Sequence, residues 1–175
     1  MSKTGGLDKA LRALLVVVAL GLIATVAHAV YVPPLHVVVA GEKAPAFTVA
    51  AEDGRTVSVP NFGGKVLVLN FWATWCPPCV EETPSLSQFA QDYANKGVVV
   101  MAISVNVSEQ AYREFLQKYK PHFLTARDQQ VHREYGTFMY PETYIIDSNG
   151  RVVQKLAEGA DWSNPNLRAY IDSLL

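Results

Sequence analysis

The chain opens with one long apolar run, whereas the remainder alternates short apolar runs with amphipathic stretches. Between residues 13 and 27 only Thr25 is polar, and extending the run to residue 32 adds one further polar group, His28. A helix over 13–32 rises about 30 Å, which is the thickness of the hydrocarbon core of a bilayer. Because no polar stripe recurs at helical spacing, a buried core helix fits poorly. We therefore predict a transmembrane segment at 13–32.

Charges on either side of this run predict its orientation. Three basic residues precede it, namely Lys3, Lys9 and Arg12, and no charge follows it before Glu42. Basic flanks stay on the cytoplasmic side of a membrane. Residues 1–12 would therefore be cytoplasmic, and the chain beyond residue 33 would lie outside.

A cleaved signal peptide is the alternative to a retained signal-anchor. The segment has a basic start, an apolar stretch and the tripeptide Ala27-His28-Ala29, which resembles a cleavage site. Both interpretations export the rest of the chain, and they differ only in whether it stays tethered.

The exported part alternates strand and helix patterns after a predicted linker at 33–44. Apolar or alternating runs predict strands at 46–51, 55–59, 66–72, 98–105, 143–147 and 151–156. Helical spacing predicts helices at 77–95, 108–119 and 165–175, the last with Asn164 as N-cap, and a helical turn at 131–135. This order, with an N-terminal β-hairpin and two buried strands joined by a helix, predicts an α/β domain over 45–175 whose mixed central sheet is flanked by helices.

Composition and charge narrow the classes of function. The 175 residues carry a net charge of −1, and residues 33–175 hold 12 basic against 15 acidic side chains. No basic stripe is present, so we expect no nucleic-acid partner. The two cysteines exclude a disulfide-stapled miniprotein and a four-cysteine zinc site.

The two cysteines form a Cys76-Pro77-Pro78-Cys79 motif between a predicted strand and a predicted helix. Cysteines three residues apart at a helix start reach disulfide geometry. Unpaired N–H groups and the helix dipole there favour an anion, so Cys76 should form the nucleophilic thiolate. Cys79, one turn further in and less exposed, should resolve the mixed disulfide. The motif therefore predicts a redox-active dithiol.

Other interpretations of the cysteine pair stay open. The pair could be half of a zinc site, although no second pair exists and the four histidines are scattered. It could bind copper with His132 as a third ligand. It could also be an inert disulfide, although so short a loop contributes little chain-entropy stabilisation.

The two intervening prolines predict the direction of the redox chemistry. Neither Pro77 nor Pro78 has an N–H to offer the Cys76 sulfur. A less stabilised thiolate makes a stronger reductant, so we expect a reduction potential nearer roughly −270 mV than roughly −120 mV.

Residues 66–84, VLVLNFWATWCPPCVEETP, resemble the thioredoxin superfamily, and most of all its exported, membrane-anchored reductases of the ResA, CcmG and TlpA type. Glu82 and Pro84 fit that family's continuation after the second cysteine. The segment from Tyr140 to Asp147 resembles its Pro-Glu-Thr strand. The resemblance spans about residues 40–175 and implies a thioredoxin-like fold.

The resemblance also implies roles for individual residues. Cys76 and Cys79 would be nucleophile and resolver, Glu82 the active-site acid, and Pro141 a cis proline that faces the dithiol. Taken alone, Pro141 could be an ordinary strand-entry proline and Glu82 a solvated carboxylate on the first helical turn.

Further side chains are expected to surround the dithiol. Asn70 stands where many thioredoxins carry a buried acid, so proton transfer to Cys79 would fall to Glu82 or water. Trp75 and Trp72 would shape an apolar rim, although Trp72 fits the core equally well. We expect Pro141, Tyr140, Trp75 and Pro77 to bind substrate.

One segment departs from the family pattern. The family often carries Gly-Val-x-Gly before the cis proline, whereas this chain has Gly136-Thr137-Phe138-Met139-Tyr140. This bulky apolar loop could form a hydrophobic docking patch beside the active site.

These features together predict a monomeric, single-pass protein of the cytoplasmic membrane whose catalytic domain lies on the periplasmic or extracytoplasmic side. It would be a thiol:disulfide oxidoreductase that needs no cofactor besides its own disulfide. By resemblance, the substrate would be apocytochrome c and the electron donor a transmembrane thiol reductase. Alternatives are a copper-site dithiol reductant, a copper chaperone, an oxidant of secreted proteins and a thiol peroxidase, although the cysteine setting typical of peroxidases is absent.

Overall fold

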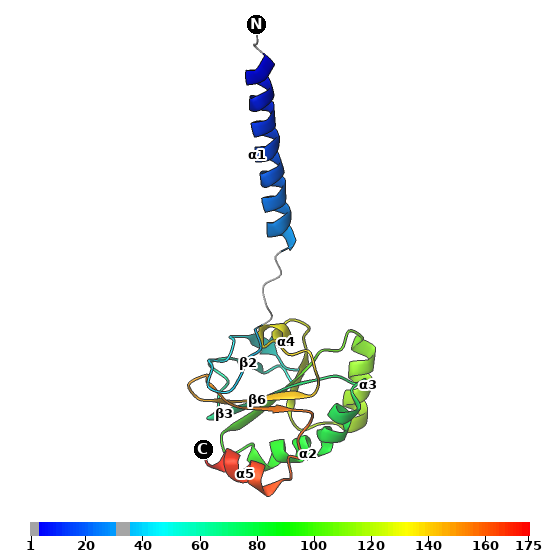
Figure 1. Ribbon diagram of the computed structural model, residues 1–175. Helices are drawn as coiled ribbons and strands as arrows, with labels where there is room; N and C mark the ends of the chain where they lie inside the picture. The colour runs from blue at the N-terminus through cyan, green and yellow to red at the C-terminus, as the bar shows by residue number, and fades with distance from the viewer. Residues whose placement is uncertain (1–3, 31–35) are drawn as a thin grey trace. The chain divides into compact units, whose positions relative to one another are not determined.

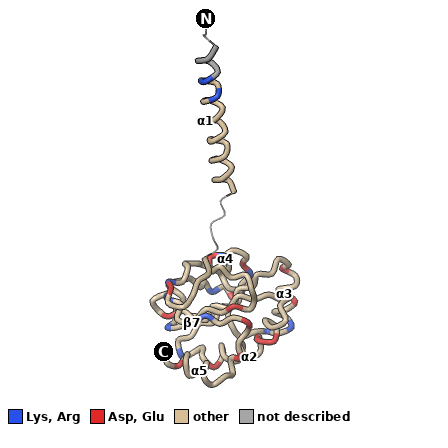
Figure 2. Tube along the Cα trace, viewed as in Figure 1, with Lys and Arg blue, Asp and Glu red and all other residues tan. Residues whose placement is uncertain are grey.

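A computed structural model of the chain describes residues 4–30 and 36–175, which fall into two units divided between Leu35 and His36 (Figure 1). The first unit contains α1 (Thr4–Val30), within which Lys9–Val30 is long and apolar enough to cross a bilayer. A signal sequence has the same length and composition. Lys9 and Arg12 lie at the N-terminal end of this stretch. Figure 2 shows basic positions near that end of α1. The predicted helical residues 31 and 32, the prolines that follow them and the predicted cytoplasmic residues 1–3 lie outside the described residues.

The predicted linker is mostly part of the folded domain. Residues 33–35 are not described, but from Val38 onward the backbone joins the domain. The Val38 N–H donates to the Tyr135 carbonyl at 3.1 Å, and the Ala44 N–H donates to the Gly150 carbonyl at 2.8 Å. Both side chains are buried. The folded unit therefore begins at His36, ahead of residue 45 where the sequence analysis placed it.

A five-stranded mixed sheet forms the centre of the domain. Its strands lie in the order β5 (Leu124–Arg127), β4 (Val98–Ser104), β3 (Val66–Trp72), β6 (Glu142–Asp147) and β7 (Val152–Ala157). β3, β4 and β5 are parallel, whereas β6 and β7 run antiparallel to their neighbours. All seven residues of β3 are buried, as its continuous apolar sequence predicts. The mixed central sheet is thus confirmed.

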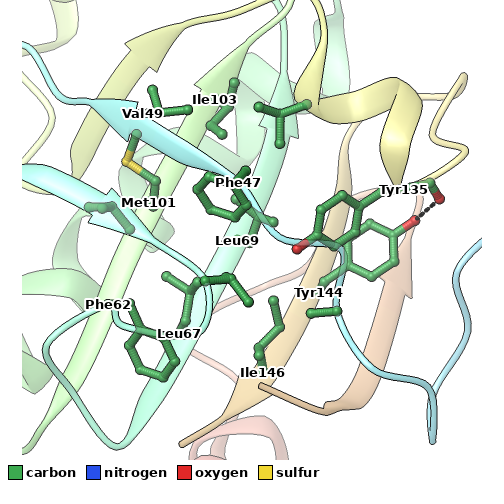
Figure 3. Packing of buried hydrophobic residues seen from close by; sticks show 14 of the residues in the cluster. Phe47, Val49, Phe62, Leu67, Leu69, Met101, Ile103, Tyr135, Tyr144 and Ile146 are labelled. Atoms are coloured by element: carbon green, nitrogen blue, oxygen red, sulfur yellow. Dashed lines mark hydrogen bonds between the residues drawn. The ribbon is translucent and has the colours of Figure 1, made fainter. Parts of the chain in front are cut away.

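Side chains alternate between the two faces of β3, so each face of the sheet has its own core. Leu67, Leu69 and Phe71 belong to the core cluster that also contains side chains of a small separate hairpin, formed by β1 (Thr48–Ala50) and β2 (Thr56–Ser58). Figure 3 shows Leu67 and Leu69 in this cluster, together with Val49 of β1. This hairpin is the predicted one, with shorter strands. Its Gly54 has φ 86°, a backbone conformation that favours glycine.

Helices cover the opposite face, where Val66, Val68 and Trp72 pack. The helices of the domain are α2 (Pro77–Tyr93), α3 (Glu109–Tyr119), α4 (Val131–Glu134) and α5 (Pro165–Asp172). Figure 1 shows α2 and α5 on one side of the sheet and the short α4 on the other. Asn164 caps α5 by accepting the Asn166 N–H, as predicted. The fold therefore places the start of α2 at the carboxyl end of the central strand β3.

Candidate active site

The disulfide between Cys76 and Cys79 lies where β3 leads into α2. Cys76 is the N-cap of the helix, with extended backbone (φ −101°, ψ 103°), and prolines occupy the first two helical positions. Proline suits these positions because its fixed φ is helical and its missing N–H would have no intrahelical partner. The two Cα atoms are 5.3 Å apart. Cys76 therefore lies at the start of a helix, three residues after the β3–α2 connection begins at Ala73, as the sequence predicts.

The Cys76 sulfur accepts one hydrogen bond within this turn. Its donor is the Cys79 N–H, at 3.3 Å. An N-cap side chain can accept a hydrogen bond from the backbone N–H of the second or the third helical residue. Pro77 and Pro78 have no N–H, so here the donor is the third helical residue, Cys79. A Cys76 thiolate in the reduced protein would keep this one donor and the positive end of the α2 dipole.

Burial does not distinguish the two cysteines in the disulfide. Cys76 is 4% exposed and Cys79 is 3% exposed, and both contact the core cluster on the helical face. Cys79 is less exposed than Cys76, as expected, but the difference in the disulfide is too small to separate their roles. Both sulfurs share a disulfide whose atoms lie within one helical turn, so the same surroundings screen both.

The Tyr140–Pro141 peptide bond is cis, as the resemblance implies. Pro141 directly precedes β6, whose Glu142 and Thr143 pair with Phe71 and Asn70 of β3. The Asn70 side chain reinforces this pairing by donating to the Thr143 hydroxyl at 2.8 Å. A pocket of about 210 Å³ is lined by residues that include Pro78, Tyr140 and Pro141. The fold thus brings the cis proline and residues 76–79, called the CPPC turn below, to one pocket.

Exposed apolar side chains gather on the loops around this pocket. Trp75 is 63% exposed, and its ring lies edge-on to that of Tyr140 with centroids 5.8 Å apart. Phe138 and Met139 are exposed to the same degree. Trp72, in contrast, is buried and packs on Phe115 with ring centroids 4.5 Å apart. Of the two tryptophans considered for the rim, Trp75 is at the surface and Trp72 belongs to the core.

Glu82 is buried, so its interpretation as a solvated carboxylate is wrong. It lies one turn beyond Cys79 on α2, and residues three apart share a helix face. Its carboxylate accepts a hydrogen bond from the Trp162 indole N–H at 2.5 Å and another from the Ala160 backbone N–H. Burial nevertheless raises the pKa of Glu82 to about 7, because desolvation outweighs these two donors. A carboxyl group of this acidity exchanges protons near neutral pH.

Sequence reasoning missed Trp162. It lies in the loop between β7 and α5, 80 residues after Glu82, and it is fully buried. Nothing local marks it, since a tryptophan before a predicted helix is an ordinary core residue. Only the antiparallel β6–β7 pair, which returns the chain to α2, brings its indole to the carboxylate.

Sequence reasoning also missed the contacts of Glu142, which hold the loop that contains the cis proline. Glu142 is buried, and Lys155 of β7 pairs with it at 2.7 Å. Its other oxygen accepts hydrogen bonds from the hydroxyls of Tyr144 and Thr137. The exposed residues Phe138 and Met139 and the half-buried Tyr140 therefore lie between two anchored ends, Thr137 and Glu142.

A third missed residue, Asn106, ties the loop before Cys76 to the end of β4. Its side-chain oxygen accepts the Thr74 N–H at 2.8 Å, and its amide donates to the Thr74 hydroxyl at 2.6 Å. The Ser104 hydroxyl donates to the same oxygen. These contacts fix the backbone two residues ahead of the nucleophile.

The copper ligand set proposed from the sequence is not assembled. His132 lies on α4, where its Nδ1 is shared between the Thr137 carbonyl at 2.9 Å and the Tyr140 hydroxyl at 3.1 Å. Within residues 9–30 and 36–175, no three or more histidine, cysteine, aspartate and glutamate side chains form a group able to hold a metal ion.

A helix-start dithiol opposite a cis proline, on a five-stranded sheet of this order, defines a thioredoxin-like thiol–disulfide oxidoreductase. The chain belongs to the Redoxin family, whose model matches residues 39–171. It is an oxidoreductase of the ResA and DsbE type.

Individual relatives agree with this assignment. Thiol-disulfide oxidoreductase ResA from Bacillus thuringiensis subsp. konkukian is 33% identical over 118 residues, covering 66% of this chain and 68% of ResA. Thioredoxin-like protein YneN from Bacillus subtilis is 36% identical over 122 residues, covering 68% and 71%. A crystal structure described as a candidate thiol:disulfide interchange protein DsbE from Chlorobium tepidum superimposes with a TM-score of 0.70. It is 29% identical and covers 79% of this chain and 99% of that one.

Proposed function

We propose that this oxidoreductase acts as a reductant outside the cytoplasmic membrane, with apocytochrome c disulfides as its substrates. The observation that carries the reducing direction is the Cys76 cap, where two prolines leave the Cys79 N–H as the donor to the sulfur. A thiolate with few donors is poorly stabilised, and the reduced protein then gives up its electrons readily. The choice of apocytochrome c is supported by the resemblance to the ResA and CcmG type.

The reaction uses the two sulfurs in sequence. The Cys76 thiolate attacks a substrate disulfide, forming a mixed disulfide and releasing one substrate thiolate. Cys79 then loses its proton and attacks the Cys76 sulfur, which breaks the mixed disulfide and releases the second substrate sulfur. The substrate gains two electrons and two protons, one proton from Cys79 and one from solvent, and the protein is left with the Cys76–Cys79 disulfide.

Glu82 serves as the base for the second step. Cys79 and Glu82 share one face of α2, and the buried carboxyl has a pKa of about 7. The carboxylate form takes the proton from Cys79, and that proton is later given up as the departing thiolate is neutralised. Asn70, buried in β3, cannot titrate, so it joins β3 to β6 through Thr143 without competing for the proton.

Turnover outside the cytoplasm requires an electron donor, because an exported compartment lacks the cytosolic thiol pool. A transmembrane thiol reductase would supply the electrons by a second round of thiol exchange at the same sulfurs. One apolar N-terminal helix is consistent with a single-pass anchor, which would hold the domain near such a donor. We infer that the anchor is retained and that the domain faces the periplasm.

Trapping of partners in cells tests this function. A Cys79→Ala variant cannot resolve its mixed disulfides, so Cys76 stays bonded to its partners. We expect apocytochromes c and a transmembrane thiol reductase among the trapped proteins, and none with a Cys76→Ala/Cys79→Ala control. Copper-oxidase subunits in place of cytochromes would favour the copper-site reductant, and a random set of secreted proteins would contradict a dedicated reductant.

A further inference from the structure

The carboxyl group of Glu82 is enclosed by a loop from the far end of the domain. Residues 158–164 connect β7 to α5, and both Glu158 and Gly159 have positive φ there, at 69° and 83°. This turn brings the Ala160 N–H and the Trp162 indole N–H onto the Glu82 carboxylate. The acid therefore depends on a segment remote from the CPPC turn for its surroundings.

The loop touches the substrate-facing side of the site as well. A Cβ atom added at Gly159 would lie 3.5 Å from Pro141 Cγ and 3.9 Å from both Glu82 Oε2 and Pro78 Cβ. The backbone at Gly159 is thus wedged between the acid, the cis proline and the CPPC turn. Any side chain here would also have to adopt a left-handed conformation.

Trp162 is held in place by contacts that do not involve Glu82. Its ring packs on Phe89 with centroids 4.9 Å apart, and its backbone N–H donates to Ser85 Oγ at 3.3 Å. Its carbonyl accepts from Arg168 Nε at 2.8 Å, and the Arg168 guanidinium pairs with Asp92 at 2.8 Å. The direction of the indole N–H is therefore set by contacts that do not depend on the Glu82 carboxylate.

The other charges around Glu82 are acidic. A pocket of about 310 Å³ beside it is lined by Glu81 of α2 and by Glu158 and Asp161 of the loop, all of them exposed. On the remaining side, beyond Pro141, Glu142 is paired with Lys155. Arg168 is engaged by Asp92 and the Trp162 carbonyl. Stabilisation of a Glu82 anion therefore comes from the two N–H donors rather than from a cation.

We propose that Trp162 is a positioning residue, which holds the Glu82 carboxylate through one indole hydrogen bond in the orientation that accepts the proton of Cys79. The proposal rests on the proposed role of Glu82. In the step concerned, the Cys79 S–H bond breaks and the proton passes to Glu82. The Cys79 electron pair forms the bond to Cys76 Sγ, and the substrate sulfur leaves with the electron pair of the mixed disulfide. The indole N–H is neither consumed nor transferred.

The test isolates the step in which Cys79 acts. The reduced protein is mixed with an aromatic disulfide at pH 5–9, and the release of the second aromatic thiolate, which reports resolution by Cys79, is followed by absorbance. Trp162→Phe removes the N–H and keeps an apolar ring. We expect the rate of this release to rise with pH as Glu82 loses its proton, and this rising part of the pH–rate profile is its acidic limb. A hydrogen bond to the charged form lowers a carboxyl pKa, so loss of the indole bond should raise the pKa of Glu82 and move the acidic limb about one pH unit higher. The rate below the limb then falls about tenfold, and the rate at high pH is unchanged.

Trp72→Phe is the matched control. Trp72 is also a buried tryptophan on the helical face, but its indole N–H has no hydrogen-bond partner among the described residues. The same ring change at this position should leave the limb in place. Equal loss of rate at every pH in Trp162→Phe would mean that the residue acts through packing alone, and it would overturn the proposal.

Glu82→Gln separates this inference from the proposed function. We expect it to abolish the limb, and Trp162→Phe in that background to change nothing further. If Glu82→Gln abolishes the limb while Trp162→Phe leaves it at the wild-type pH, Trp162 is not a positioning residue and Glu82 keeps its role. If the limb survives in Glu82→Gln, the proposed role of Glu82 itself is wrong.

A measurement on the unmodified chain keeps the test independent of variant folding. With ¹⁵N-labelled tryptophan, the Trp162 indole resonance should titrate with the same midpoint as the limb, while the Trp72 resonance stays constant. A Trp162 resonance that does not move between pH 5 and 9 would overturn the proposal.

Discussion

At the scale of single residues, the site depends on groups whose ionisation is set by burial and by a small number of donors. Glu82 is removed from water and held by Trp162 and Ala160, which leaves its pKa at about 7. Cys76 is placed at a helix start with one amide donor. The ionisation of the acid is therefore set mainly by desolvation, whereas that of the nucleophile is set by its position at the helix start.

The raised pKa of Glu82 predicts a pH dependence of stability. The folded protein holds this proton up to about pH 7, whereas the unfolded chain releases it near its ordinary value of 4.5. Stability should therefore fall as the pH rises from about 4.5 to 7, by up to about 3 kcal/mol from this group. Glu82→Gln cannot ionise and should lose that part of the decline. Urea unfolding of both oxidised proteins at pH 5 and pH 8 measures the difference, and parallel pH dependence in the two would contradict the assignment.

The prolines of the motif predict a change in reduction potential. Pro78 stands at the second helical position, whose N–H can reach the side chain of an N-cap residue. Pro78→Ala restores that donor and should stabilise the Cys76 thiolate, which raises the potential by about 30 mV for one charged hydrogen bond. Pro84→Ala, further along α2, restores an N–H too remote to reach Cys76 and serves as control. An unchanged potential in Pro78→Ala would show that the missing amide does not set the reducing character.

At the scale of elements, the loop between α4 and β6 presents the face that a protein substrate would meet. Thr137 and Glu142 anchor its ends, while Phe138 and Met139 are 62% and 63% exposed between them. Exposed apolar groups beside a reactive site are typical of interaction surfaces. The anchoring explains how a loop of bulky side chains keeps a fixed position beside the disulfide.

Removing the apolar groups of this loop should affect large substrates selectively. We expect Phe138→Ser/Met139→Ser to lower kcat/KM several-fold for a protein disulfide while leaving the reduction of a small aromatic disulfide unchanged. Val39→Ser, which removes an exposed apolar side chain of the N-terminal segment of the domain, is the matched control. Equal losses on both substrates would mean that the loop supports the dithiol rather than the docking of proteins.

Sequence patterns predict some of these elements better than others. The continuous apolar runs of β3 and β4 and the proline-led start of α2 are strong local features, and both are confirmed. β5 was missed because Leu124 to Arg127 gives only four residues with two polar side chains, and it becomes a strand by pairing with Met101 to Ser104. The contacts of Trp162 and Lys155 were missed because they arise only when β7 folds back along β6.

At the scale of the whole molecule, the sheet organises the site by bringing four loops to the disulfide. The turn after β3 carries the cysteines, and the loop after β4 holds that turn through Asn106. The loop before β6 supplies Pro141, and the loop after β7 supplies the donors to Glu82. Strand order β5-β4-β3-β6-β7 makes β3 and β6 neighbours, so the nucleophile and the cis proline meet.

The ion pair between Glu142 and Lys155 predicts a stability effect within this framework. Lys155→Met leaves a buried carboxylate without its cation, which should lower the free energy of unfolding by about 2 kcal/mol, below the range for fully buried pairs because Lys155 is 20% exposed. Adding Glu142→Gln removes the uncompensated charge and should recover most of the loss. Urea denaturation of the two variants measures both effects, and a double variant no more stable than Lys155→Met would contradict a charge-based cause.

If the Cys76–Cys79 pair is a reducing dithiol, its reduction potential must be low, and this potential can be measured. The domain would be equilibrated with defined ratios of reduced and oxidised dithiothreitol or glutathione, and the fraction of dithiol quantified by thiol alkylation. We expect a potential near the thioredoxin value of roughly −270 mV. A potential above about −180 mV, in the range of disulfide isomerases and oxidants, would contradict it.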